Sequence, residues 1–215
     1  MDRKHSCSIC PPSRQTFKQT NVKVRNEKLQ QYANKTLATL GSGDMANAVK
    51  LPPNEDLNEW LAVNIVDFFN ELNLLYGTIC NSCTRESCPK MSAGTHDYLW
   101  QDNARYQVPT SMPASEYVDK LMDWAESQIN DESVFPLQHG QPFPRDFKKK
   151  VSAMFRRFFR VYAHIYCNHM EHVTQISATA HLNTCFKHFY YFVREFQLVD
   201  EKELKPLEDI ISKFK

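Results

Sequence analysis

Two cysteine and histidine pairs in this sequence could together bind a metal ion. Cys83 and Cys88 are separated by four residues, and so are His164 and His169. Thiolate sulfur and imidazole nitrogen are preferred ligands of Zn²⁺, and two of each complete its tetrahedral shell. About 75 residues separate the two pairs, far more than in a DNA-reading C2H2 finger. The spacing therefore predicts a structural zinc site that joins two distant segments of the chain.

The choice of ligands is ambiguous on residue chemistry alone. Residues five apart on an ideal helix point about 140° away from each other. His164 and His169 can therefore share a metal only if their helix is distorted or their side chains reach around it. His169 and His172 would meet more easily, and Cys80 is a third thiol near the first pair. Ordinary burial of these side chains without a metal is a further alternative.

Basic and acidic residues are segregated along the sequence, although the formal net charge is only +1. Arg156, Arg157 and Arg160 alternate with phenylalanines on a predicted amphipathic helix. Clustered guanidinium groups favour a phosphate because each offers a planar fork of N–H donors. A solvated helix face is the simpler alternative. An acidic stretch also occurs over residues 55–71. The chain is therefore predicted to bind both negatively and positively charged partners.

Helical periodicity predicts the elements that must position these groups. Apolar residues at three- and four-residue steps predict a helix that Asp56 caps and that begins near Leu57. Ser115 is predicted to cap another helix, which ends near Asn130. Further predicted elements are helices over residues 30–40, 146–176, 178–198 and 202–214, and a small hairpin around residues 98–108 with its turn at 102–103.

Composition predicts a mostly α-helical, single-domain bundle that carries this small β-hairpin and the zinc site. The 215 residues are 42% hydrophobic, and 14 Phe and 9 Tyr against 5 Gly favour packed helices over a turn-rich β architecture. Residues 1–20 carry no helical period and are predicted to be a flexible tail. The domain is then expected over residues 21–215.

The chain also lacks the patterns of several other protein classes. No run approaches the roughly 18 apolar residues of a membrane span, and the short basic stretch lacks a motif that reads nucleic acid. The N-terminus has no apolar signal-peptide core, and the seven cysteines are an odd number. We therefore expect reduced thiols or metal ligands in a protein of the cytoplasm or the nucleus, with no nucleic acid among its partners.

Several motifs resemble the Mob (Mps one binder) kinase-activator family. They are LNEWLAVNIVDFF at residues 57–69, CTRESCPKMSAG at 83–94, FRVYAHIY at 159–166 and HLNT at 181–184. The similarity extends from about residue 16 to the C-terminus. It implies a Mob-type helical domain with a structural zinc ion, bound at the positions that match Cys83, Cys88, His164 and His169.

The resemblance also implies a phosphate-binding surface. In activating Mob proteins, a basic cluster at the positions of Arg156, Arg157 and Arg160 binds phosphothreonine segments of sterile-20-type kinases or scaffolds. Thr16 and Thr39 match positions that upstream kinases phosphorylate in the same branch.

A second surface is implied for Glu55, Glu59 and Asp67. In the family, this acidic region docks the basic N-terminal helical segment of NDR/LATS-type kinases. Opposite charges would steer the association and fix its register more than they would add affinity.

The implied function is that of a non-catalytic adaptor and co-activator of NDR/LATS-type Ser/Thr kinases in Hippo-like or mitotic-exit signalling. The alternative is a phosphopeptide-binding scaffold component that does not activate these kinases, because residues 122–124 and 183–191 look closer to a sister branch of the family. An enzyme is not expected. Four protein ligands leave the zinc no open position, and neither HExxH nor GxSxG occurs.

Overall fold

The computed structural model of the chain describes residues 44–102, 104–137 and 141–214. Within these ranges the long helices are α3 (Leu57–Ile79), α4 (Ala114–Ile129), α5 (Phe147–Asn168) and α7 (Thr179–Glu195). The shorter elements are α2 (Met45–Ala48), β1 (Ser92–Ala93), β2 (His96–Asp97), α6 (Met170–Gln175), α8 (Glu201–Leu204), α9 (Glu208–Ile211) and the 3-10 helices η2 (Lys205–Leu207) and η3 (Ser212–Phe214). The predicted mostly helical class is confirmed.

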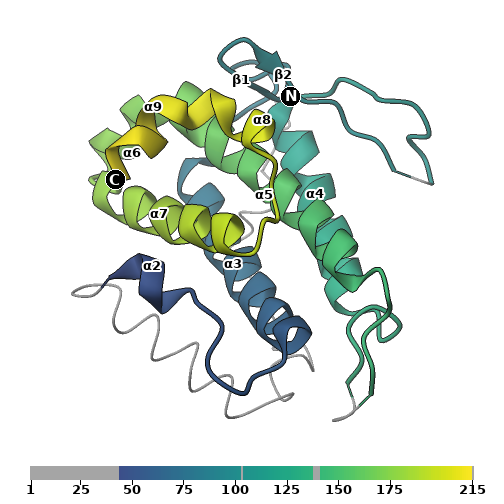
Figure 1. The fold of residues 1–215 in the computed structure, drawn as a ribbon. Coiled ribbons are helices and arrows are strands. Elements are labelled where there is room, and N and C mark those ends of the chain that lie inside the picture. Colours follow the sequence, from purple (N-terminus) through teal and green to yellow (C-terminus); the bar gives the residue numbers. More distant parts are fainter. Residues whose placement is uncertain (1–43, 103, 138–140, 215) are drawn as a thin grey trace.

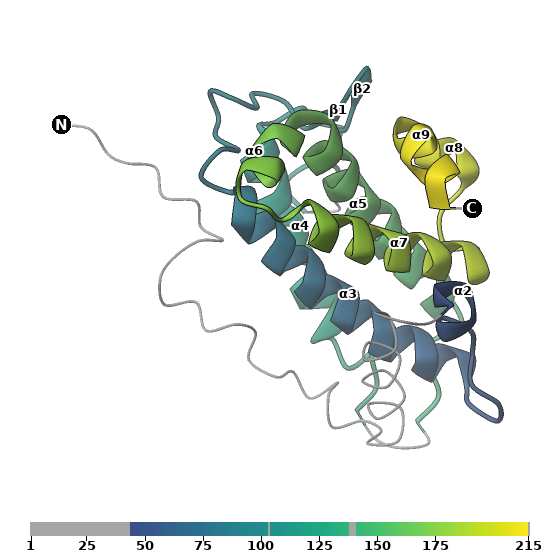
Figure 2. The same ribbon diagram turned by 90° about the vertical axis from the view of Figure 1, so that its left-hand side faces the viewer.

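α3 is the central helix, and it begins at the predicted residue. Asp56 caps it, because the carboxylate of Asp56 accepts from the backbone N–H groups of Asn58 at 2.8 Å and Glu59 at 3.1 Å. α3 packs along α5 and also contacts α4 and α7. In two perpendicular views, α7 crosses the bundle beside α3, and the C-terminal helices lie on the far side of α5 (Figures 1 and 2).

An aromatic core holds these helices together. The Phe68 ring of α3 lies 5.5 Å from Phe155 of α5, and 5.6 and 5.1 Å from Phe189 and Phe192 of α7, between ring centroids. All four rings are buried. Burial of each such side chain contributes about 1.5–3 kcal/mol, and the edge-to-face contacts add to this. The core therefore fixes the positions of α3, α5 and α7 relative to one another.

Two predicted helices are interrupted in the structure. The helix predicted over residues 146–176 is broken at His169, which has φ −129° and ψ 9° and separates α5 from α6. The predicted C-terminal helix divides into four short pieces, and Pro206 lies in the first 3-10 turn. Proline has no N–H to donate, so an α-helix is disfavoured at this point. Ser115 is not a cap: α4 starts at Ala114.

The β-hairpin lies earlier in the chain than predicted. Strands β1 and β2 pair antiparallel through a turn at Gly94, whose φ of +58° is a conformation that glycine adopts readily. In the predicted segment, Trp100 and Thr110 form one isolated bridge. The loop between them folds back because the Asp102 carboxylate accepts from the N–H groups of Ala104 and Tyr106. Together with a backbone hydrogen bond from the N–H of Asp102 to the carbonyl of Tyr106, these side-chain bonds close the loop without a longer strand ladder.

The predicted tail over residues 1–20 and the helix predicted over residues 30–40 lie outside the described residues, so the domain boundary stays a prediction. No helix in the described ranges is both long and apolar enough to cross a membrane.

Candidate functional site

The side chains of Cys83, Cys88, His164 and His169 converge inside the protein. All four residues are buried, and their ligand atoms lie within 4.8 Å of one another. Each cysteine sulfur lies 3.4 Å from an imidazole Nε2, Cys83 from His164 and Cys88 from His169, and the two Nε2 atoms are 3.2 Å apart. Ligands about 2.0–2.3 Å from a tetrahedral zinc ion stand roughly 3.3–3.8 Å from one another. The four residues are therefore positioned to bind a metal ion.

The break at His169 removes the geometric obstacle to this site. α5 ends at Asn168, so His169 leaves the helical path, and its ring lies 5.0 Å from that of His164 between centroids. This is the local distortion that a five-residue spacing requires. His172 points elsewhere, with its Nε2 3.3 Å from the carbonyl oxygen of Thr78. Cys80 is not part of the convergent group formed by the described residues.

Hydrogen bonds behind the two imidazoles turn their Nε2 lone pairs toward each other. Nδ1 of His164 lies 2.7 Å from the carbonyl oxygen of Ser92, which can only accept. Nδ1 of His169 lies 3.4 Å from Oγ of Ser82, whose own proton is donated to the carbonyl of Ile79. Both Nδ1 atoms therefore carry the proton, and two Nε2 lone pairs face each other across 3.2 Å. Such outer hydrogen bonds are typical of metal-binding histidines.

The two cysteines are anchored to other helices. Cys83 donates its N–H to the carbonyl of Ile79, at the end of α3, and the carbonyl of Cys88 accepts from Ala114, the first residue of α4. Cys83 and the two imidazoles hold the pKa of the Cys88 thiol well below its usual value, which favours the thiolate that metals bind. A metal here would join the end of α3, the start of α4 and the α5–α6 junction.

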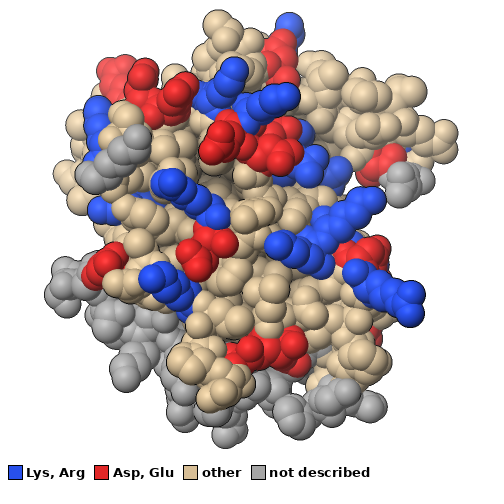
Figure 3. Space-filling model, in the orientation of Figure 1, with Lys and Arg blue, Asp and Glu red and all other residues tan. Residues whose placement is uncertain are grey.

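A cluster of arginines lies on the outer side of α5, where Lys and Arg side chains gather in the right-hand half of Figure 3. Arg157 is held between two indole rings, with its guanidinium carbon 4.8 Å from the centroid of Trp100 and 4.1 Å from that of Trp124. Its Nη2 donates to the carbonyl of Gln101 at 2.9 Å. Arg157 is therefore oriented by groups from two separate segments, the loop at residues 100–101 and helix α4.

Arg160 lies one turn further along α5 and is also held in place. Its Nη1 donates to the hydroxyl of Tyr117 at 3.0 Å, and its guanidinium lies 5.2 Å from the centroid of the Tyr98 ring. Its contact with Glu203 of α8 is long, at 4.0 Å. A stronger anion could replace this weak ion pair.

The arginine cluster retains unused hydrogen-bond donors. Nε of Arg156, Nη1 of Arg157 and Nε of Arg160 are buried and have no acceptor among the described residues. Buried donors without acceptors cost free energy. Burial also lowers the pKa of Arg157, so a nearby anion would offset the cost of keeping this side chain charged. A tetrahedral oxyanion would supply several acceptors at one point.

The acidic residues lie along one side of α3. Glu55 precedes the helix, Glu59 is in its first turn, and Asp67 is followed on the same side by Leu74, which is 59% exposed. A stripe that combines carboxylates with an exposed leucine suits a basic amphipathic partner. The predicted kinase-docking role of Glu55, Glu59 and Asp67 stays a prediction, as does the phosphorylation of Thr16 and Thr39, which lie outside the described residues.

Comparison with known proteins identifies the family. A model of the Mob1/phocein family matches residues 37–207. MOB kinase activator-like 1A of Arabidopsis thaliana is 53% identical over 176 residues, which cover 81% of this chain and 82% of the relative. MOB kinase activator 3A of Mus musculus is 52% identical over 178 residues, which cover 82% of each. Maintenance of ploidy protein mob1 of Schizosaccharomyces pombe is 46% identical over 196 residues, which cover 91% of this chain and 92% of the relative. The chain therefore belongs to the Mob1/phocein family.

Proposed function

We propose that this protein is a non-catalytic adaptor that binds and activates a protein kinase. The names of its relatives support this role, because they include kinase activators that are 53% and 52% identical in sequence to this chain. The observation that carries the binding part of the proposal is the arginine cluster, with three buried N–H groups that lack acceptors among the described residues. Such a surface suits recognition of an anionic segment of a partner protein.

The metal in this proposal is zinc, and its role is structural. Two thiolates and two imidazoles are a ligand set typical of zinc, and with four protein ligands the ion has no position left for a reacting water. Zinc would neutralise the thiolate charge and satisfy the two Nε2 lone pairs. It would thereby hold the hairpin segment against α5, the helix that carries the arginines.

The anionic partner is proposed to be a phosphothreonine segment of a sterile-20-type kinase or of a scaffold protein. A phosphate has three acceptor oxygens and close to two negative charges at neutral pH. Arg156, Arg157 and Arg160 offer N–H groups on one helix face, and two of these side chains are already oriented by aromatic rings and hydrogen bonds. Little side-chain entropy would then be lost on binding.

Replacing Arg157 by alanine is expected to weaken phosphopeptide binding by about 30-fold or more. The loss follows from one charge-assisted hydrogen bond, donated by the buried Nη1 of Arg157 that lacks an acceptor among the described residues, which contributes about 1.5–3 kcal/mol. Arg157→Lys should recover only part of the affinity, because the ammonium lacks the planar fork. Fluorescence anisotropy with a labelled phosphothreonine peptide and its unphosphorylated counterpart measures the effect.

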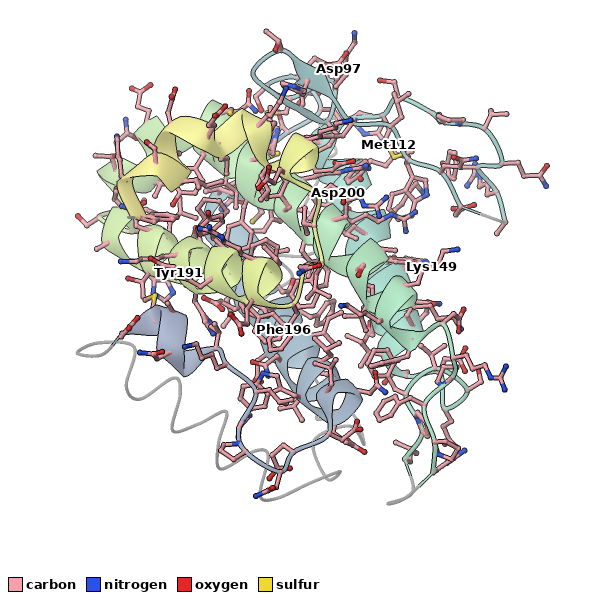
Figure 4. All side chains as sticks on the ribbon, in the orientation of Figure 1. Asp97, Met112, Lys149, Tyr191, Phe196 and Asp200 are labelled. Carbon is pink, nitrogen blue, oxygen red and sulfur yellow. The ribbon has the colours of Figure 1, made fainter. Side chains whose placement is uncertain are left out.

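Lys149→Ala is the matched control for this test, because Lys149 is an exposed cation on the same helix, nearer its start (Figure 4). It should bind the phosphopeptide nearly as tightly as the wild type. Equal affinity of the wild type and Arg157→Ala, with both proteins folded, would refute the phosphate assignment.

The kinase itself is proposed to be of the NDR/LATS type, docked on the acidic stripe of α3 through its basic N-terminal helical segment. Asp67→Lys is expected to weaken this association by about tenfold at low salt, because it reverses a charge in the middle of the stripe. Asp209→Lys, on the exposed side of α9, is the control for the change in net charge. Titrations of labelled kinase segments measure both variants.

The kinase titration also separates the two candidate functions. If the folded, zinc-loaded wild type binds phosphopeptide but no kinase segment, the protein is a phosphopeptide-binding scaffold component. The arginine cluster, which is independent of the α3 stripe, is the observation that favours this second candidate.

A further inference from the structure

Two cationic side chains outside the arginine cluster lie against the ring of Tyr106. Nζ of Lys120, on α4, lies 4.8 Å from the centroid of the Tyr106 ring, and the guanidinium carbon of Arg105 lies 5.7 Å from it. Neither cation takes part in an ion pair among the described residues. An aromatic ring can hold cations in place while their outer N–H groups remain available to an anion.

The loop that carries Tyr106 is tied to Arg157 by a chain of short contacts. Asp102 accepts from the N–H of Tyr106 at 2.9 Å and from Nε1 of Trp100 at 2.9 Å. Trp100 in turn packs against the guanidinium of Arg157. The Asp102 carboxylate is used by these donors and by the N–H of Ala104, so it serves to hold the loop closed rather than to pair with Lys120.

Helix α4 makes a second connection between the two groups of cations. Lys120 and Trp124 are four residues apart on α4, and thus about 6 Å apart along its axis. Trp124 packs directly on Arg157. Side chains with nitrogen ends gather below Met112 in Figure 4. An extended bound peptide advances about 3.3–3.6 Å per residue. A few residues of such a peptide would therefore reach from Arg157 to Lys120 and Arg105.

We propose that Lys120, Arg105 and Tyr106 form a second anion subsite, which takes the carboxylate of an Asp or Glu one to three residues from the phosphothreonine. The subsite deepens the proposed function, because it rests on phosphothreonine recognition by the arginine cluster. It defines the ligand as an acidic phosphopeptide. Lys120 supplies the charge from a helix, and the loop supplies Arg105 and the supporting ring.

Three labelled phosphothreonine peptides test the subsite by fluorescence anisotropy. One has neutral flanks, one has three Glu residues before the phosphothreonine, and one has three Glu residues after it. One of the acidic peptides is expected to bind the wild type about fivefold more tightly than the neutral peptide, as two exposed ion pairs would predict. Unphosphorylated acidic peptide measures attraction by charge alone and should bind far more weakly.

Variants of Lys120 assign the gain to the subsite. Lys120→Met keeps the aliphatic stem on Tyr106 but removes the charge, so it should reduce the fivefold gain to about twofold, and Lys120→Met with Arg105→Gln should abolish it. Affinity for the neutral phosphopeptide should stay within about twofold in both variants. Lys149→Met, with the same charge change elsewhere on the basic side, should retain the full gain.

The outcomes separate this inference from the proposed function. If acidic flanks add nothing, or if the gain survives in the double variant, the subsite is refuted while phosphothreonine binding stands. If the wild type binds none of the phosphopeptides, both proposals fail together.

Discussion

Loss of the metal is expected to lower the melting temperature of this protein by about 10–20 °C. Without a cation, the Nε2 lone pairs of His164 and His169 would face each other at 3.2 Å in a buried site. Metal binding in small zinc-dependent peptides is worth about 10–16 kcal/mol. The aromatic core of α3, α5 and α7 would survive in part, so we expect a loss of about 5 kcal/mol. For a domain of this size, each kcal/mol corresponds to about 2–4 °C.

Thermal melts of the zinc-loaded protein, with and without 1,10-phenanthroline, measure this effect, and elemental analysis gives the metal content. Cys88→Ser should reproduce most of the chelator effect and should bind less than one equivalent of zinc. Cys167→Ser is the matched control, because Cys167 is an exposed thiol next to the site and not one of the convergent ligands. An unchanged melting temperature in Cys88→Ser, or no response to the chelator, would contradict a structural metal.

The helices with local signals could be predicted from the sequence. The start of α3 at Leu57 follows from one capping residue and an apolar period, and both act within a few residues of each other. The ligand types of the metal site could be predicted as well, because two cysteines and two histidines are a ligand set typical of zinc. The resemblance to the family was needed to choose His169 over its neighbours.

The break between α5 and α6 could not be predicted in this way. No glycine or proline marks His169, and the amphipathic pattern continues past it. The helix ends because the ring of His169 meets His164, Cys88 and Ser82, and Ser82 and Cys88 are more than 80 residues away in the sequence. A tertiary contact overrides local propensity here.

The support of Arg157 was missed for the same physical reason. Arginine clusters are visible in a sequence, but the indoles of Trp100 and Trp124 meet Arg157 only after α4, α5 and the 100–110 loop have packed. Their role in orienting a phosphate site leaves no local signal. Glu71 was likewise counted only as one of several carboxylates, although its environment differs from theirs.

Glu71 lies on α3 and is expected to make the stability of the protein fall as the pH rises from about 4.5 to 7. Burial raises the pKa of this carboxyl to about 7; a hydrogen bond from the Cys185 thiol opposes the shift, and the charge of Asp67 adds to it. The folded state therefore binds more protons than the unfolded state between the ordinary pKa of 4.5 and about 7. Stability is lost across this window and the full cost persists above it.

Glu71→Gln should remove this cost, because the amide cannot ionise. At pH 8 the variant is expected to be more stable than the wild type by up to about 3 kcal/mol, from 1.36 kcal/mol per pKa unit. At pH 4 the carboxyl is neutral in both states, so the difference should nearly vanish. Urea unfolding at a series of pH values measures the difference directly, and Glu126→Gln, at an exposed position of α4, is the control. Any fixed effect of the amide on packing is the same at every pH, so only a gain that grows between pH 4.5 and 7 identifies a buried carboxyl. A gain that is constant with pH would mean that Glu71 ionises as a solvent-exposed glutamate does.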